Sequence, residues 1–442
     1  MIQVREYAVI THDTNQEASI DLGVVSKATF DWLLDLHSQW KGDSPLLKLQ
    51  NSKSVKLESY VGYLQSPYGE SIEVLPKTHI KPLEKKELPG VRNLLRNMLL
   101  TALSLKPREA DAALLQRQNT PLHEWIISQY LLELVKLVRR GLHFDYLQVE
   151  EESRFVRGQL DISRQSRQTP DRATLFHIRH DVFSPNRREN RLLKTALGYI
   201  LKICNEPDNW RVANELSHKL SELDSYHNPV YELAKWQSGK LMQSYDDIRP
   251  WCELIIEKLN PNFQKGMHKG ISLMFPMEYL FESYVAYWLR HALTEGCNIT
   301  TQASSRYLMK HQAVDTSVER DWFMLKPDIL LVSKFKSSVM DTKWKLLNSQ
   351  LSSTDYKYGL KQADMYQLYA YGMKYMNGKG NMMLIYPLCD EFKEPLPRFS
   401  FDNDLHLWVV PFDLKSRELV SGDWSGCFPE IANVVSSRLA EY

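Results

Sequence analysis

Hydrophobic residues recur with two different spacings in the C-terminal part of the chain, and each spacing predicts a type of element. Over 277–289 they recur every three or four positions, which predicts a helix with a wide buried stripe. The stretch 359–375 also has the helical period. Two short apolar runs, 329–332 and 339–340, flank a polar connector, which is typical of neighbouring strands joined by a turn. With a further strand at 382–386, the predicted order is helix, strand, strand, helix, strand.

The N-terminal half mixes the two spacings. Apolar stretches at 57–64 and 71–75 flank the turn residues Ser66-Pro67-Tyr68-Gly69, which predicts a β-hairpin. Its role is either structural or the presentation of an exposed tip to a partner. Helical periods follow at 91–99, 127–138 and 192–200.

Length and composition predict several domains. The chain has 442 residues and a hydrophobic content of 43%, enough for more than one core, so we expect two or three domains. We predict a β-rich N-terminal domain over 1–90, a mostly helical region over 91–265, and a further domain of strands and helices over 266–442. The expected fold class is therefore α+β and multidomain.

Charge and cysteine usage narrow the cellular setting. The formal net charge is +1, so any surface for nucleic acid must be local. The five cysteines are scattered without C-x-x-C spacing, which fits neither a disulfide framework nor a zinc site and indicates a reducing compartment. No signal pattern opens the chain, and no apolar run reaches the length of a bilayer. We expect a cytoplasmic protein without a membrane contact.

A local basic segment lies at 154–191, where nine arginines occur with few acids between them. Arginine forks suit phosphate groups, so Arg157, Arg187, Arg188 and Arg191 are candidate contacts to nucleic acid. The alternative is that the arginines form ion pairs inside the protein, with Glu150, Glu151 and Glu152 among the candidate partners. Asn190 is placed to cap the helix that follows it.

Candidate chemistry gathers around the two strands at 329–332 and 339–340. Asp328 precedes the first strand, and Asp341 and Lys343 follow the apolar part of the second, two apart and therefore on one face. Two carboxylates so close would repel each other, and a hard ion such as Mg²⁺ removes that penalty. Lys343 could then orient an attacking water, help to deprotonate it, or neutralise charge on a phosphate. The alternative is a solvated strand end.

The two neighbouring helices add three candidates. Glu282 lies beside the buried stripe of the first helix, at the rim of the core or simply in solvent. Gln367 and Tyr371 are four apart in the second helix, so they share a face and could reach a phosphate or a nucleic-acid strand. Their alternative role is packing.

This order of elements and residues resembles the PD-(D/E)xK nuclease superfamily, and Pro327-Asp328 and Asp341-x-Lys343 match its motif. The resemblance implies a mixed sheet flanked by helices over 266–442, with a metal-dependent phosphodiesterase site. Carried over by position, Glu282, Asp328 and Asp341 bind the metal, Mg²⁺ with Mn²⁺ as a substitute, and Lys343 assists. Gln367 and Tyr371 match an additional motif of several branches.

Four further segments are similar to the McrC family, the nuclease subunits of McrBC-type modification-dependent restriction systems. They are VGYLQSPYGESIEVLPK at 61–77, LLRNMLL at 94–100, VRGQLDI at 156–162 and NRLLKTAL at 190–197. The resemblance implies an antiphage DNA endonuclease whose N-terminal region docks on a separate McrB-like AAA+ GTPase hexamer and stimulates it. That partner recognises modified double-stranded DNA. This sequence has no G-x-x-x-x-G-K-[ST] motif. The alternatives are a non-catalytic scaffold that activates the motor, and a nuclease acting on RNA.

Overall fold

The structure is a computed structural model that describes residues 1–40, 42, 44–80, 87–105, 120–258, 270–312, 318–333, 336–401 and 404–431. The chain forms two compact units. One contains Met1–Asn119 and Met274–Tyr442, and the other contains Thr120–Leu273. These bounds differ from the three predicted parts, because helix α2 (Leu88–Ala102) packs against α10 (Met277–His291) and so belongs with the first unit. At the level of fold class, the multidomain mixture of helices and strands is as expected.

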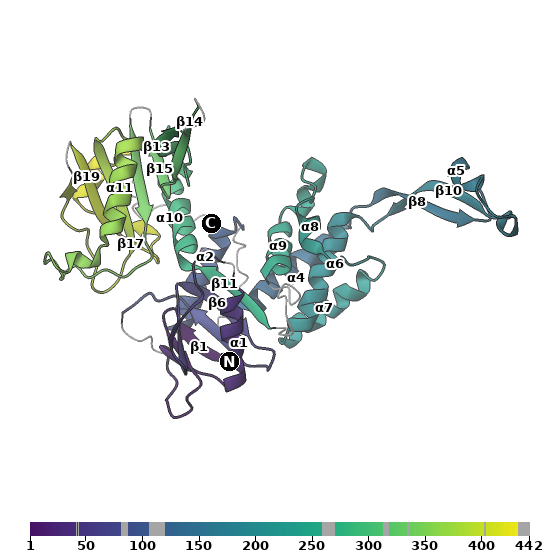
Figure 1. Ribbon diagram of the computed structural model, residues 1–442, viewed down its shortest axis with the longest axis horizontal. Helices are drawn as coiled ribbons and strands as arrows, with labels where there is room; N and C mark the ends of the chain where they lie inside the picture. The colour runs from purple at the N-terminus through teal and green to yellow at the C-terminus, as the bar shows by residue number, and fades with distance from the viewer. Residues whose placement is uncertain are drawn as a thin grey trace. The chain divides into compact units, whose positions relative to one another are not determined.

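Two four-stranded sheets form the N-terminal part of the first unit (Figure 1). The order of one sheet is β1 (Ile2–Arg5), β7 (Ser71–Leu75), β6 (Tyr60–Gln65), β11 (Ile271–Pro276). The order of the other is β3 (Leu22–Val24), β2 (Val9–Thr11), β5 (Ser54–Leu57), β4 (Leu47–Asn51). Helix α1 (Lys27–Ser38) begins after Ser26, whose side chain accepts a hydrogen bond from Thr29 N. Strands β6 and β7 confirm the predicted hairpin, but they lie in the middle of their sheet and are almost entirely buried.

A mixed sheet forms the C-terminal part of the first unit. Its order is β12 (Asn298–Thr301), β15 (Ile329–Val332), β16 (Ser337–Thr342), β17 (Gly380–Pro387), β19 (Leu405–Asp413), β18 (Phe399–Ser400), and β20 (Glu418–Leu419) also pairs with β19. β15 and β16 are antiparallel, whereas β16, β17 and β19 run parallel. The neighbouring strands β17 and β19 contain continuous apolar runs, as is typical of strands that are covered on both faces of a sheet, and β17 is buried from Met382 to Pro387.

Two helices flank β16. They are α10 and α11 (Gln362–Tyr375), and both pack against β16 (Figure 1). The 3₁₀ turn η3 (Lys357–Gly359) precedes α11, so the predicted helix starts three residues later than its apolar period indicated. A separate hairpin of β13 (Arg306–Gln312) and β14 (Glu319–Leu325) leads into β15, and η4 (Asp423–Cys427) follows β20.

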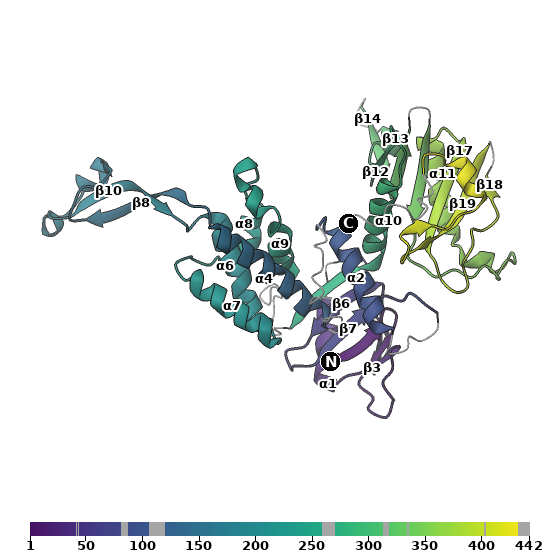
Figure 2. The same ribbon diagram turned by 180° about the vertical axis from the view of Figure 1, so that it is seen from behind.

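The second unit is a group of helices from which a β arm extends, as Figures 1 and 2 show. Its helices are α4 (Leu122–Arg140), α6 (Arg188–Ile203), α7 (Pro207–Lys219), α8 (Pro229–Leu233), the 3₁₀ helix η2 (Lys240–Tyr245) and α9 (Arg249–Lys258). In the arm, β8 (Asp145–Ser153) pairs with β10 (Phe176–Ser184) along its full length, and β9 (Gln159–Leu160) pairs with the start of β10. The short helices α5 (Ile162–Gln165) and η1 (Pro170–Arg172) complete the arm. The arm coincides with most of the predicted arginine-rich segment.

Candidate active site at the end of strand β16

The antiparallel pairing of β15 and β16 brings Asp328 and Asp341 to the same end of the sheet. Ile329 lies opposite Met340, so the residues flanking this pair are neighbours. The Asp328 carboxylate accepts two hydrogen bonds from Thr342, from N at 2.8 Å and from Oγ1 at 2.9 Å. This contact fixes Asp328 beside the end of β16. Short-range sequence pattern placed both acids correctly, but nothing in it indicated Thr342.

Asp341 is a buried carboxylate with one cationic neighbour. Its side chain is 1% exposed, and the Lys343 ammonium lies 2.5 Å from Oδ2. Apart from this ion pair, neither Asp341 oxygen receives a hydrogen bond from the described residues. Burial and then the charge of Asp328 raise the pKa of Asp341 to about 7, against the opposing effect of Lys343. Burial alone would lower the pKa of Lys343, but Asp341 and Asp328 outweigh it, so the pKa of Lys343 is raised.

Helix α10 supplies Glu282, which lies at the rim of the core. Its Oε1 accepts a hydrogen bond of 2.6 Å from Gln302 Nε2. Burial, followed by the charge of Asp328, raises the pKa of Glu282 to about 7, while Gln302 and Lys343 lower it. Gln302 has a φ of +50°, a conformation that is uncommon outside glycine, asparagine and aspartate. Sequence pattern gave no signal for Gln302.

Helix α11 supplies Gln367 and Tyr371, which are joined as their four-residue spacing predicts. Gln367 Nε2 lies 2.7 Å from the Tyr371 hydroxyl, which in turn donates to the carbonyl of Lys326 at 2.9 Å. Tyr371 therefore braces the chain two residues before Asp328. Asp364, one turn before Gln367, also raises the pKa of Asp341 through its charge. Its spacing of three from Gln367 on one helix was the signal that could have identified it.

The oxygen atoms at this site fit a hard cation. Among the described residues, no three His, Cys, Asp or Glu side chains gather closely enough to form a complete metal cage. Mg²⁺ does not require one, because it commonly uses one or two carboxylates and keeps waters and phosphate oxygens as its other ligands. Asp341 supplies a buried carboxylate whose only polar partner among the described residues is Lys343, and Asp328 lies beside it. A bound cation would offset both the burial and the repulsion from Asp328, which together raise the pKa of Asp341.

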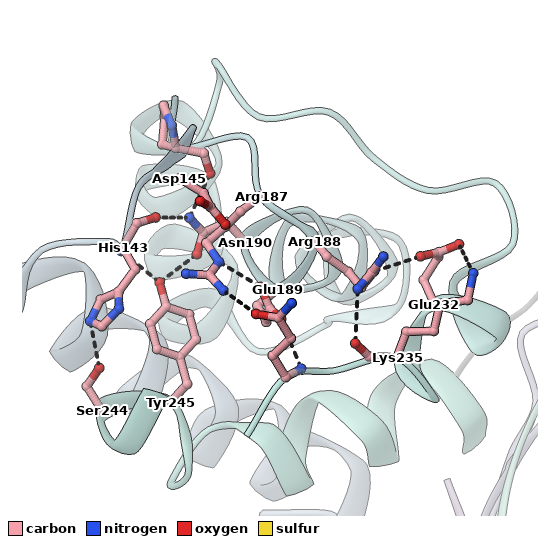
Figure 3. Close-up of polar contacts among 12 residues, drawn as sticks. His143, Asp145, Arg187, Arg188, Glu189, Asn190, Glu232, Lys235, Ser244 and Tyr245 are labelled. Atoms are coloured by element: carbon pink, nitrogen blue, oxygen red, sulfur yellow. Dashed lines mark hydrogen bonds and ion pairs between the residues drawn. The ribbon is translucent and has the colours of Figure 1, made fainter. Parts of the chain in front are cut away.

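The candidate nucleic-acid contacts lie in the second unit, and most of them have partners there. Figure 3 shows Arg187 paired with Glu189 at 2.7 Å and Arg188 paired with Glu232 at 2.9 Å. Arg191 lies over the ring of Tyr226, 4.0 Å from its centroid. Arg157 is exposed and has no ion pair among the described residues. The contacts of Arg187, Arg188 and Arg191 favour the structural alternative for these three side chains.

The arginines of the arm also form ion pairs within the protein, which was the alternative to contacts with nucleic acid. Arg164 and Arg179 both pair with Glu150, at 2.9 Å and 2.6 Å, and Arg172 lies 3.4 Å from Glu152. The expectation that Asn190 caps a helix is wrong, because α6 begins two residues earlier. Asn190 instead donates to the carbonyls of His143 and Pro185 and accepts a hydrogen bond from the Tyr245 hydroxyl, joining both ends of the arm to the helices (Figure 3).

Fold and site together define a multidomain α/β protein with a buried acid–lysine site at the end of a mixed sheet. The family of the protein is shown by a match over most of its sequence. A family model described as "McrBC 5-methylcytosine restriction system component" matches residues 55–387, so the chain belongs to this family. No curated protein matches the chain. In the described part of the chain, no helix has the length and apolar character needed to cross a membrane.

The solved structures that are similar to this chain include the following two. The first is described as a refined half-complex from a tetradecameric assembly of Thermococcus gammatolerans McrB AAA+ hexamers with bound McrC. Its TM-score is 0.64 at 17% identity, over 97% of this chain and 98% of that one. The second is a Thermococcus gammatolerans McrBC complex, with a TM-score of 0.49 at 20% identity over 66% of this chain and 88% of that one. At such identities, the first similarity supports the fold.

Proposed function

We propose that this protein is a Mg²⁺-dependent DNA endonuclease of the PD-(D/E)xK type, acting as the nuclease subunit of a McrBC-like restriction system. The observation that carries the proposal is the buried Asp341, paired with Lys343 and adjacent to Asp328, in a member of the McrBC family. Burying several charges at one strand end costs free energy. Carboxylates with strongly raised pKa values in such places are typical of binding and catalytic sites.

Each side chain has a role in this proposal. Asp328 and Asp341 hold Mg²⁺. Glu282 is assigned to the ion by the superfamily motif alone, because the described residues form no cluster of three metal-binding side chains. The ion supplies positive charge to the phosphate of the scissile bond. Lys343, kept cationic by two carboxylates, donates to the attacking water or to a phosphate oxygen. Gln367 and Tyr371 keep the chain before Asp328 in place through the hydrogen bond to Lys326.

The proposed partner is a McrB-like AAA+ GTPase hexamer, since the chain has no phosphate-binding loop of its own. Two surfaces suit docking. One is the tip of the β6–β7 hairpin, where Tyr68 is 57% exposed. The other is the far end of the arm, where Phe155, Val156 and Ile162 are 73%, 55% and 74% exposed. Exposed apolar side chains of this size mark interaction sites. The proposed substrate is double-stranded DNA with modified cytosine.

A second candidate function is a non-catalytic scaffold that activates the motor. The observation in its favour is that no three acidic or histidine side chains in the described residues form a metal cage. The ion pair between Asp341 and Lys343 would then be a structural contact.

Cleavage of methylated and plain DNA in Mg²⁺ decides between the two functions. The reactions compare the wild type with Asp341→Asn, each with and without the AAA+ protein and its nucleotide. Cleavage that needs partner and nucleotide and is lost in Asp341→Asn supports the nuclease. Stimulated nucleotide hydrolysis without cleavage of either DNA supports the scaffold. The same reactions with RNA test the third alternative.

A further inference from the structure

One buried acid outside the candidate site lies in the N-terminal part of the first unit. Glu6 follows β1, and its side chain is 0% exposed. Its Oε1 accepts hydrogen bonds from the backbone N of Lys77 at 2.7 Å and from the indole Nε1 of Trp344 at 2.6 Å. The Ser59 hydroxyl lies 3.5 Å from Glu6 Oε2. One carboxyl oxygen thus joins two segments that are far apart in the sequence.

Trp344 connects this carboxyl group to the candidate site. It directly follows Lys343, and its ring packs on Phe281, with centroids 5.3 Å apart. Phe281 directly precedes Glu282. A buried indole held at its nitrogen and along its ring therefore constrains the backbone on which Lys343 and Glu282 are placed.

A second contact reaches the same helix. The N–H of Met277, the first residue of α10, donates to the carbonyl of Ser59 at 3.0 Å. Tyr7, which directly follows Glu6, has a φ of +64°, a strained conformation for a bulky residue. The N-terminal sheets thus hold both α10 and the segment after β16.

We propose that Glu6 is a positioning residue for the nuclease site, acting through Trp344 on Lys343. This inference rests on the proposed function, because it assigns a role within that reaction. The N-terminal part, which carries one of the proposed docking surfaces, is then coupled to the acid–lysine site by a buried hydrogen bond. If the end of β1 moves, the hydrogen bond between Trp344 and Glu6 breaks, and Lys343 then shifts from its position beside Asp341.

The test compares Glu6→Leu, Glu6→Gln and Trp344→Phe in the full chain assembled with its AAA+ partner. Glu6→Leu removes the acceptor, whereas Glu6→Gln keeps an oxygen for both donors and can donate to Ser59. We expect Glu6→Leu to lower the cleavage rate about 10- to 100-fold, since small displacements of catalytic groups have effects of this size. Nucleotide hydrolysis by the partner stays unchanged, and Glu6→Gln restores cleavage. Trp344→Phe keeps the ring on Phe281 and reproduces the cleavage loss even where Glu6→Leu does not fold.

Amide hydrogen exchange over 341–345 gives a readout that is independent of cleavage, because Lys343 N donates to the Ile385 carbonyl. Faster exchange there in Glu6→Leu and Trp344→Phe supports the coupling. Trp424→Phe is the matched control, since that buried indole donates to Val420. Unchanged cleavage and exchange in Trp344→Phe, or an equal loss in Trp424→Phe, overturns the inference. If the wild type cuts no DNA, the proposed function fails, and the exchange data alone decide the coupling.

Discussion

The acid–lysine site and the β arm are both rich in charged side chains, but these are largely buried in the site and exposed to solvent in the arm. The Asp341 side chain is 1% exposed beside a lysine that is 27% exposed. In the arm, Glu150 is 36% exposed beside Arg164 at 58%. The same kind of ion pair is therefore buried in one region and solvated in the other.

Solvent decides what each pair can do. Burial raises the pKa of Asp341 to about 7, and apart from Lys343 its oxygens have no polar partner among the described residues. The ionised carboxylate is therefore unfavourable on its own, and a bound cation would stabilise it. The arm pairs are screened by water and contribute about 0–1 kcal/mol each. The arm is held instead by its strand ladder and by the Asn190 hydrogen bonds at its base. Buried charge suits catalysis, and exposed charge with apolar side chains suits recognition.

Removing one cation from each region tests whether burial sets the effect of an ion pair on DNA cleavage. Lys343→Ala should lower DNA cleavage about 1000-fold, because the site loses several kcal/mol of charge stabilisation. Arg179→Ala, which removes an exposed partner of Glu150, should leave cleavage unchanged and alter the free energy of unfolding by less than about 1 kcal/mol. Cleavage assays and denaturant unfolding check both. Similar losses in the two variants would show that burial does not set the difference.

Binding to the AAA+ ring tests the two proposed docking surfaces one at a time. Replacing Phe155 and Val156 together by Ser should weaken binding to the AAA+ ring about 10- to 100-fold, as expected if they are central apolar contacts. Deleting Pro67–Gly69 tests the hairpin tip in the same binding assay. The isolated protein should keep its melting temperature in both variants. If neither change weakens ring binding, both proposed docking surfaces are wrong.

Buried acid in the N-terminal part should appear as a pH dependence of stability. Burial raises the pKa of Glu6 to about 8, against hydrogen bonds from Lys77 and Trp344 that lower it. The folded state then holds a proton that the unfolded state releases, so stability falls as pH rises from 4.5, the ordinary pKa of a glutamate, towards 8. The slope is roughly 1.4 kcal/mol per pH unit. Glu6→Gln should lower the slope by this amount in denaturant unfolding between pH 6 and 8, and most clearly above pH 7, where Asp341 and Glu282 contribute less. An identical slope in the variant would show that Glu6 is ionised.

The smallest effect concerns DNA contacts of the second unit. Arg157 is exposed without an ion pair in the described part of the chain, so Arg157→Ala should lower the slope of log binding constant against log salt by about 1. Arg188→Ala, which breaks the pair with Glu232, should lower stability and leave the slope unchanged. DNA binding titrations at several salt concentrations distinguish them. A change of slope in Arg188→Ala alone would reverse the assignment.

Much of the local structure was predictable because its causes are local. Hydrophobic period placed α10, α11, β15 and β17, and turn residues placed the β6–β7 hairpin. The two-residue spacing of Asp341 and Lys343 put both side chains on one face, since strand side chains alternate. The superfamily motif then predicted the site residues by position, and their roles stay a prediction. The family match itself covers 55–387.

Other features depend on which distant segments the fold brings together, and no local pattern encodes them. Gln302 follows β12, which pairs with β15, and it donates to Glu282 of α10. Arg188 and Arg191 likewise meet Glu232 and Tyr226, which lie far from them in the sequence. The Glu6–Trp344 hydrogen bond joins residues 338 positions apart. The helices, the strands and the residues able to do chemistry could be read from the chain, because hydrophobic period and residue spacing act within a few residues. Which charges are buried and which are paired depends on the folded arrangement, because burial is a property of the packed core.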